Sequence, residues 1–305
     1  GKLSEYIPFQ QRKRMTRLGE ALAKIINLQP KLLLTNYEIY RELWKLYEAG
    51  DVSYLRGEIP TKETYKRTRH LLRKEGIIRR DEDYAALWRV LSKPDASSED
   101  IICSVDPYCY ISHISAMQRY GLTNRRPEAL YMTQPTPTIR RLRLNTVMET
   151  DYGEALFAHR EEIEHIKALS HPEYVRGRAV AFHATKFFGE YVHIKGTFSR
   201  LATIGQTFLD MIEMPSHCGG MIHVLDIWSE HARTYLDEII ARVETIEKPI
   251  LKVRAGYILD EHLAVRNPRI EKWLDFVQRG SSRVLDPGKP FSSNYSEKWM
   301  LSLNA

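Results

Sequence analysis

Residues 61–75 mix cations with apolar side chains in an order that an α-helix sorts onto two sides. At about 100° per residue, four cations fall within about 40° of one another. This row consists of Lys62, Lys66, Arg69 and Arg73, and Arg67 and Lys74 flank it. The opposite side holds the residues that can enter a core, which are Thr64, Tyr65, Thr68, Leu71 and Leu72. Thr61 suits the N-cap and Gly76 the end. The segment therefore predicts a helix that is buried along one stripe and cationic along the other.

Two helices are expected before this one and a hairpin after it. Arg12–Asn27 has apolar residues at helical spacing, and Thr35 with Glu38 forms a capping box for a second helix that Gly50 ends. Ile77–Arg80 and Tyr84–Leu91 are β-rich runs around a polar turn. Three helices followed by a hairpin is the order of a winged helix-turn-helix, with the third helix as the recognition helix and the hairpin as the wing.

The candidate DNA contacts are the cations of this N-terminal region. They are Arg12, Lys13, Arg14, Arg17, Lys62, Lys66, Arg67, Arg69, Arg73, Arg79 and Arg80. Lysine and arginine neutralise phosphates, and arginine also addresses guanine edges. The alternative is a solvated basic face without a ligand. The predicted wing tip, Asp81–Asp83, is acidic and opposes a role for the wing on a phosphate backbone.

The charge is distributed unevenly along the chain. The 305 residues include 45 lysines and arginines and 39 acidic residues, and residues 1–95 hold 20 and 13 of them respectively. This predicts a DNA-binding domain over 1–95 joined to a second domain over 96–305. The 43% of apolar residues and 10% of aromatics exclude a disordered chain. Without a secretory segment or a long apolar run, and with three unpaired-looking cysteines, we expect a cytoplasmic protein that does not enter membranes.

The remainder of the chain predicts a mixed α/β domain that ends in a helical bundle, so the expected class is α+β. The strand candidates are Ala129–Gln134, Arg140–Asn145, Ala179–His183 and Tyr191–Ile194. The last hundred residues have helical spacing. The polar stretch Pro94–Asp100 marks the boundary.

No constellation selects a reaction. Cys109, His113, His217, Cys218 and His223 are metal-capable, but the closely spaced cysteine pair typical of zinc sites is absent. Asp210, Glu213 and His217 share a helical spacing suited to acid–base work, yet Pro215 interrupts that helix. We therefore expect no metal, no cofactor and no catalytic residue. An enzyme that acts on nucleic acid through these three residues is the less favoured alternative.

Three segments resemble the AbiEi family, the antitoxins of type IV toxin–antitoxin (abortive infection) systems. Asp106–Leu122 is similar to the family's aromatic-Ser-x2-Ser-Ala-x4-Gly-Leu helix, and Arg254–Leu259 to its Arg-x-Gly-Tyr-Leu-Leu helix. Leu201–Gly220 resembles a third motif, with Thr207, Leu209, Asp210, Pro215, Gly219 and Gly220 in place. The family's wing glycine is missing, and Tyr84–Trp88 stands there instead.

The resemblance implies an autorepressor whose N-terminal domain binds inverted repeats in its own promoter. It also implies a C-terminal domain that counters a nucleotidyltransferase-like toxin without a tight complex. We expect a monomer that pairs on double-stranded DNA. The alternative from another class is a plain transcription factor whose C-terminal domain senses a ligand or a partner.

Overall fold

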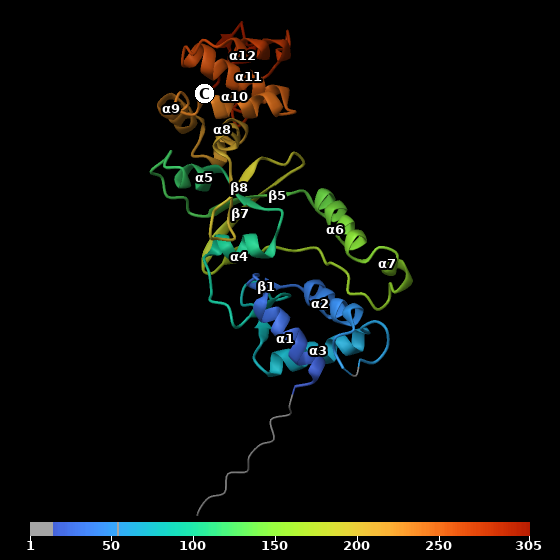
Figure 1. Ribbon diagram of the computed structural model, residues 1–305. Helices are drawn as coiled ribbons and strands as arrows, with labels where there is room; N and C mark the ends of the chain where they lie inside the picture. The colour runs from blue at the N-terminus through green and yellow to red at the C-terminus, as the bar shows by residue number, and fades with distance from the viewer. Residues whose placement is uncertain (1–14, 54) are drawn as a thin grey trace, which may run out of the picture. The chain divides into compact units, whose positions relative to one another are not determined.

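The structure, a computed structural model, describes residues 15–53 and 55–305. It mixes helices with several sheets, which confirms the α+β class (Figure 1). The chain divides into two compact units. The first contains the described residues up to Ala96 together with Arg141–His171, and the second contains Ser97–Arg140 and Pro172–Ala305. The sequence placed 141–171 in the second domain, so that part of the predicted division differs from the structure.

The N-terminal part of the first unit has the expected order of elements. These are α1 (Arg17–Leu28), β1 (Leu33–Leu34), α2 (Asn36–Ala49), α3 (Lys62–Lys74), β2 (Ile78–Arg80) and β3 (Trp88–Val90). The predicted capping box is confirmed, because the Glu38 N–H donates to Thr35 Oγ1 at 3.0 Å and the Thr35 N–H donates to Glu38 Oε1 at 3.1 Å. Gly50 ends α2 in the left-handed region at φ 66°. The strands form an antiparallel sheet in the order β1-β3-β2.

One predicted strand is wrong. Arg140–Asn145 lies inside the helix α6 (Pro137–Tyr152), which the short helix α7 (Ala155–Ala158) follows. Proline suits the first helical position, and the Arg140 N–H bonds to the Thr136 carbonyl at 3.0 Å. Arginine and leucine are strong helix formers and make up five of these six residues, so the short alternating run does not distinguish a strand from a helix.

The end of α6 and the coil after α7 complete the core of the first unit. Met148, Tyr152 and Ile163 are buried with the side chains of α2. The ring of Tyr152 meets that of Trp44 edge to face, with centroids 5.1 Å apart. Helix α2 is therefore covered by a segment that follows it by about a hundred residues in the chain.

The second unit is built on a six-stranded mixed sheet in the order β6-β7-β5-β4-β9-β8. The strands are β4 (Tyr110–Ile111), β5 (Leu130–Pro135), β6 (Tyr174–Val175), β7 (Arg178–Thr185), β8 (Tyr191–His193) and β9 (Arg200–Ala202). Two helices accompany them, α4 (Ser98–Val105) and α5 (His113–Arg119). Strand β5 pairs in parallel with β7 and antiparallel with β4. Strands β5, β7 and β8 confirm three of the four predicted strand positions.

The C-terminal part of the second unit is helical, as expected. Its helices are α8 (Ile204–Glu213), α9 (Met221–His231), α10 (Leu236–Thr245), α11 (Pro249–Tyr257) and α12 (Pro268–Glu271). Shorter elements are the 3-10 turns Pro215–His217 and Lys272–Phe276, the π-turn Ile258–His262, and the pair β10 (Tyr295–Ser296) and β11 (Leu301–Ser302). None of the helices formed by the described residues is long and apolar enough to cross a membrane.

Two glycines permit close approach in this helical part. A Cβ at Gly205 would lie 2.6 Å from the backbone carbonyl oxygen of Glu238, so α8 and α10 touch through that position. A Cβ at Gly256 would lie 2.3 Å from the buried ring of Trp299. Gly256 belongs to Arg254–Leu259, one of the segments that carry the family resemblance, and the structure gives it a packing role.

Candidate nucleic-acid interface

Helix α3 separates its two faces as its sequence predicts. Thr61 caps it, accepting a hydrogen bond from the Thr64 N–H at 3.1 Å. Tyr65, Thr68 and Leu72 are buried. The other face is open to solvent and holds Lys62, Lys66, Arg67 and Arg73 as exposed residues and Arg69 as a half-buried one. The predicted row of four cations therefore lies along one side of a single helix.

A buried tryptophan extends this row onto the sheet. Trp88 is only 2% exposed, and three guanidinium groups lie around its indole ring. Their Cζ atoms lie 3.9 Å (Arg80), 5.3 Å (Arg69) and 5.9 Å (Arg73) from the ring centroid. A cation over an aromatic face is attracted by the ring quadrupole. We call Arg69, Arg73, Arg80 and Trp88 the arginine–tryptophan cluster.

The amide of Asn36 holds this cluster together. Its Oδ1 accepts hydrogen bonds from Tyr65 Oη at 2.7 Å, Trp88 Nε1 at 2.9 Å and Arg69 Nη1 at 3.0 Å. Asn36 is the first residue of α2, so α2, α3 and β3 all meet at one oxygen. Because its hydrogen bond fixes the direction of the Arg69 guanidinium, Asn36 acts as a positioning residue.

The cluster carries positive charge that no nearby carboxylate neutralises. Within residues 15–53 and 55–305, no acidic oxygen lies within 4.0 Å of a guanidinium nitrogen of Arg69, Arg73 or Arg80. Burial lowers the pKa of Arg80, and the charges of Arg69 and Arg73 lower it further. Gathering three like charges is unfavourable unless an anion is present. The geometry therefore suits an external anion.

Other predicted contacts lie elsewhere. Arg79 is directly opposite Arg89 across the hairpin, on the face of the sheet away from the Arg80–Trp88 pair. Arg17 and Arg67 line a separate cavity of about 450 Å³ between α1 and α3. Arg12, Lys13 and Arg14 lie outside the described residues.

The acidic wing tip is partly turned inward. Asp81 is 4% exposed, and its Oδ2 accepts the backbone N–H groups of Asp83 and Tyr84, each at 3.0 Å. Its carboxylate therefore closes the turn of the hairpin. Only Glu82 in this tip is fully exposed, so the expected repulsion of phosphate is weaker than three open carboxylates would cause.

Sequence reasoning missed Trp88 and Asn36 as parts of the site. From the sequence, Trp88 is expected to be an apolar strand residue, and Asn36 an ordinary residue within a capping box. The register that places Arg80 opposite Trp88 was a usable signal, because a hairpin pairs such residues on one face.

The acid–base candidates of the second unit do not converge. Asp210 is buried, and its Oδ1 accepts from Gln206 Nε2 at 2.8 Å. Glu213 pairs with Lys248. His217 instead joins His113 and His183, with ring centroids 5.2 to 5.7 Å apart. Among the described residues, no group of three histidine, cysteine or acidic side chains is arranged to hold a metal ion.

Asp210 supplies a test of pH dependence. Burial raises its pKa from 3.8 to about 7, so between these values the folded chain keeps a proton that the unfolded chain releases. Stability is therefore lost as the pH rises through this window. Asp210→Asn removes this loss and keeps the oxygen that Gln206 contacts, so we expect the variant to be more stable at pH 8 by about 1–3 kcal/mol, and much less so at pH 5. Calorimetric melting at both pH values measures it.

The three histidines His113, His183 and His217 make stability depend on pH in the opposite direction, so they provide an internal reference. Burial lowers the pKa values of His113, His183 and His217, so their contribution is lost as the pH falls below about 6.5. This acid-side loss is common to the wild type and Asp210→Asn. Equal destabilisation of the variant at both pH values would contradict the assigned role of the Asp210 proton.

Comparison with known proteins does not identify a family for this chain. No family model matches the chain, and no curated protein matches it. Among solved structures, the chain is similar to the crystal structure of the RV2827C protein from Mycobacterium tuberculosis. The two are 12% identical with a TM-score of 0.41, and the match covers 94% of this chain and 92% of that one. The functional argument therefore depends on the geometry of the first unit.

Proposed function

We propose that this protein is a DNA-binding transcriptional regulator whose first unit is a winged helix-turn-helix. The observation that carries the proposal is the arginine–tryptophan cluster, whose three guanidinium groups meet at the exposed face of α3 without an acidic partner within 4.0 Å among the described residues. The order α1-β1-α2-α3-β2-β3 supports it, because it places this face on the third helix, beside a hairpin. Residues 50–61 make a longer link between α2 and α3 than a simple helix-turn-helix has.

The family resemblance extends the proposal to an autorepressor and type IV antitoxin. On this proposal the first unit binds inverted repeats in its own promoter, and two copies meet on the duplex. The second unit counters a nucleotidyltransferase-like toxin without a tight complex. Among the residues that carry the resemblance, Gly256 packs against the ring of Trp299, so it supports the fold of the second unit. The surface of this unit that would counter the toxin is to be located by mutagenesis.

Binding to the upstream promoter tests the DNA-binding part. We expect the full chain to bind a fluorescent duplex of this region more tightly than a scrambled duplex, as measured by anisotropy. The logarithm of the affinity should fall linearly with the logarithm of the salt concentration, with a slope of about −3.6 to −5.4 for about four to six neutralised phosphates. Equal binding to the two duplexes contradicts an operator, and a flat salt dependence contradicts the cationic interface.

Genomic context and co-expression test the second part. A neighbouring nucleotidyltransferase gene whose toxicity is relieved by this chain supports the antitoxin. The competing proposal is a regulator that senses a ligand, which a polar cavity of about 490 Å³ in the second unit favours. That cavity is lined by residues such as Glu99, Asp100, Arg119 and Arg178. Promoter affinity that changes with a cellular metabolite, and an unrelated neighbouring operon, support the sensor instead.

A further inference from the structure

A carboxylate of the first unit occupies one end of α3. Glu162 Oε2 accepts a hydrogen bond from the backbone N–H of Lys62 at 2.8 Å, and Lys62 is the first residue of the helix. The N-terminus of a helix carries partial positive charge and unpaired N–H groups, so it favours an anion there. In a helix-turn-helix, the N-terminal end of the recognition helix usually contacts base edges. In this protein, Glu162 already places a negative charge at that end of α3.

The segment that carries Glu162 is anchored. The next residue, Ile163, is fully buried in the core of the first unit. His159 meets Trp44 with ring centroids 6.0 Å apart, and the Ile166 N–H lies 3.4 Å from Met148 Sδ. Because these contacts hold the coil on both sides of Glu162, its carboxylate is a fixed part of the first unit.

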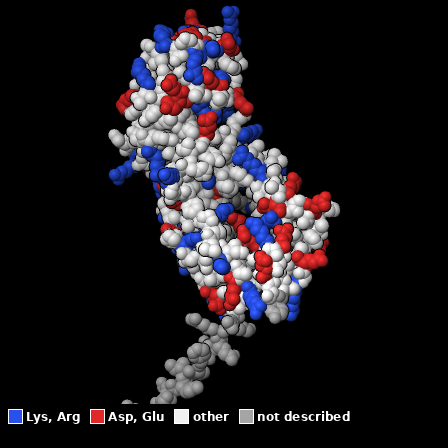
Figure 2. All heavy atoms as spheres, in the orientation of Figure 1, with Lys and Arg blue, Asp and Glu red and all other residues white. Residues whose placement is uncertain are grey.

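Acidic residues are concentrated in this region of the first unit. Glu161 and Glu164 neighbour Glu162 in sequence, and Glu149, Asp151 and Glu154 precede them. Figure 2 shows acidic side chains gathered where Figure 1 places α7. The N-terminal end of α3 therefore combines a cation, Lys62, with the carboxylate of Glu162 and that of Glu63 in its own first turn, both of which repel phosphate.

The other end of the helix has a different electrostatic environment. Lys62 and Arg73 are eleven residues apart, which corresponds to about 16 Å along the axis. Charges are largely screened beyond about 8 Å at physiological ionic strength. The charge of Glu162 therefore acts on Lys62 and only weakly on the arginine–tryptophan cluster.

We propose that Glu162 determines which part of α3 receives DNA: its carboxylate keeps phosphate away from the N-terminal end, and the duplex docks on the arginine–tryptophan cluster. This inference rests on the proposed DNA-binding function. It assigns Lys62, the first cation of the predicted row, almost no part in binding while Glu162 is charged. Glu162 then discriminates between two docking positions on one helix.

A double-mutant cycle on Lys62 and Glu162 tests the proposal with the promoter duplex. Glu162→Gln keeps an oxygen for the Lys62 N–H and removes the charge. We expect it to raise affinity about two- to fivefold, as for one charge at a helix end. Lys62→Ala should change affinity less than about twofold in the wild type, but reduce it about three- to tenfold in the Glu162→Gln background, where a phosphate contact is possible.

Glu161→Gln is the matched control. Glu161 is exposed, forms no hydrogen bond or ion pair with the described residues of α3, and differs from Glu162 by one position in sequence. Its neutralisation changes net charge by the same amount, so we expect less than half the gain that Glu162→Gln produces. Melting curves of the variants confirm that each is folded. A second readout is hydrogen exchange of residues 62–65, which the duplex should protect more strongly in Glu162→Gln than in the wild type.

The outcomes separate this inference from the proposed function. Binding that Lys62→Ala weakens equally in both backgrounds overturns the role of Glu162, and so does an equal gain from Glu161→Gln and Glu162→Gln. In both cases DNA binding itself remains. If the wild type and all variants bind the promoter no better than the scrambled duplex, the proposed function is wrong, and the inference is overturned with it.

Discussion

Replacing Arg69 and Arg73 together with alanine is expected to weaken promoter binding by about 30-fold or more, because a lost charged contact to DNA costs about 1–3 kcal/mol. Both guanidinium groups lie beside Trp88 on the open face of α3, and among the described residues no carboxylate oxygen lies within 4.0 Å of their nitrogens. Anisotropy titrations at fixed salt measure the loss. The slope of the logarithm of the affinity against the logarithm of the salt concentration should also become shallower by about 2, as expected for two lost phosphate contacts.

A control with the same charge change separates the cluster from general electrostatics. Lys24 and Lys45 are exposed on α1 and α2, outside the cluster. Lys24→Ala with Lys45→Ala also removes two cations, and we expect its effect to be below about 1 kcal/mol. Unchanged affinity in the arginine double variant, or an equal loss in the lysine double variant, would show that α3 does not recognise DNA through this cluster.

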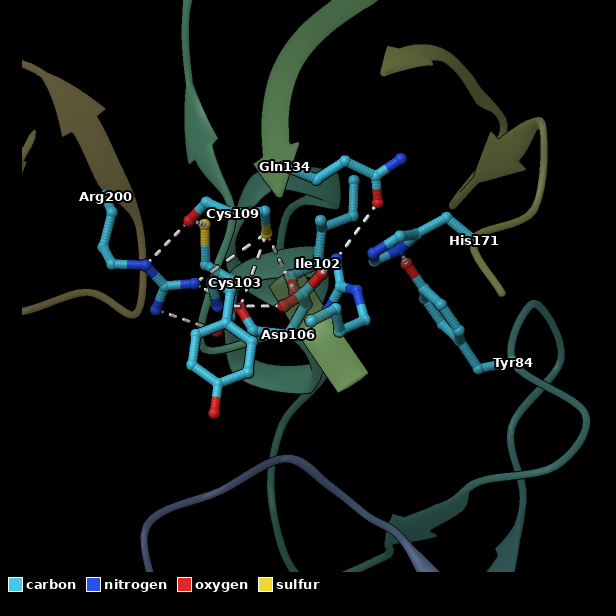
Figure 3. A network of polar contacts seen from close by, with 10 residues as sticks. Tyr84, Ile102, Cys103, Asp106, Cys109, Gln134, His171 and Arg200 are labelled. Atoms are coloured by element: carbon cyan, nitrogen blue, oxygen red, sulfur yellow. Dashed lines mark hydrogen bonds and ion pairs between the residues drawn. The ribbon is translucent and has the colours of Figure 1, made fainter. Parts of the chain in front are cut away.

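The second large effect is expected in the second unit, at Arg200. This residue of β9 is 7% exposed, and its guanidinium donates to three backbone carbonyls at the end of α4 and before β4 (Figure 3). Nε bonds to the Cys109 oxygen at 2.7 Å, Nη1 to the Cys103 oxygen at 3.1 Å, and Nη2 to the Asp106 oxygen. A cation at this position also complements the negative end of α4.

Arg200→Met is expected to lower the free energy of unfolding of the second unit by about 3–5 kcal/mol, because it leaves several buried carbonyls without donors. Faster hydrogen exchange in α4, β4 and β9 measures the loss region by region, which suits a chain with two units. The matched control is Arg178→Met. Arg178 is an arginine with a 38% exposed side chain that pairs with Glu99, so we expect its loss to cost less than about 1 kcal/mol. Equal effects would contradict the role of Arg200.

Local signals were sufficient for the helices of the first unit. The capping box at Thr35, the cap at Thr61 and the stop at Gly50 each act within four residues of the chain, and all three are present in the structure. The helical spacing of α3 also predicted which of its residues are exposed. These features depend on neighbours along one helix, and the same neighbours are present in the sequence.

The failures concern groups that are distant in the chain. Arg140–Asn145 belongs to a helix because Pro137 starts α6 and because the end of that helix completes a core around α2. Binding to the promoter and protection against a toxin depend on partners outside the chain, so both stay predictions.

The sequence alone determines the α+β class, the caps and stops of the main helices, and the cationic face of α3. The tertiary structure alone decides that Trp88 and Asn36 gather the arginines, and that Glu162 takes the N-terminal end of α3. The physical reason is the range of the interactions. Caps and periodicity join residues within one or two turns, whereas Asn36 meets Trp88 and Lys62 meets Glu162 only after the chain has folded back over tens of residues.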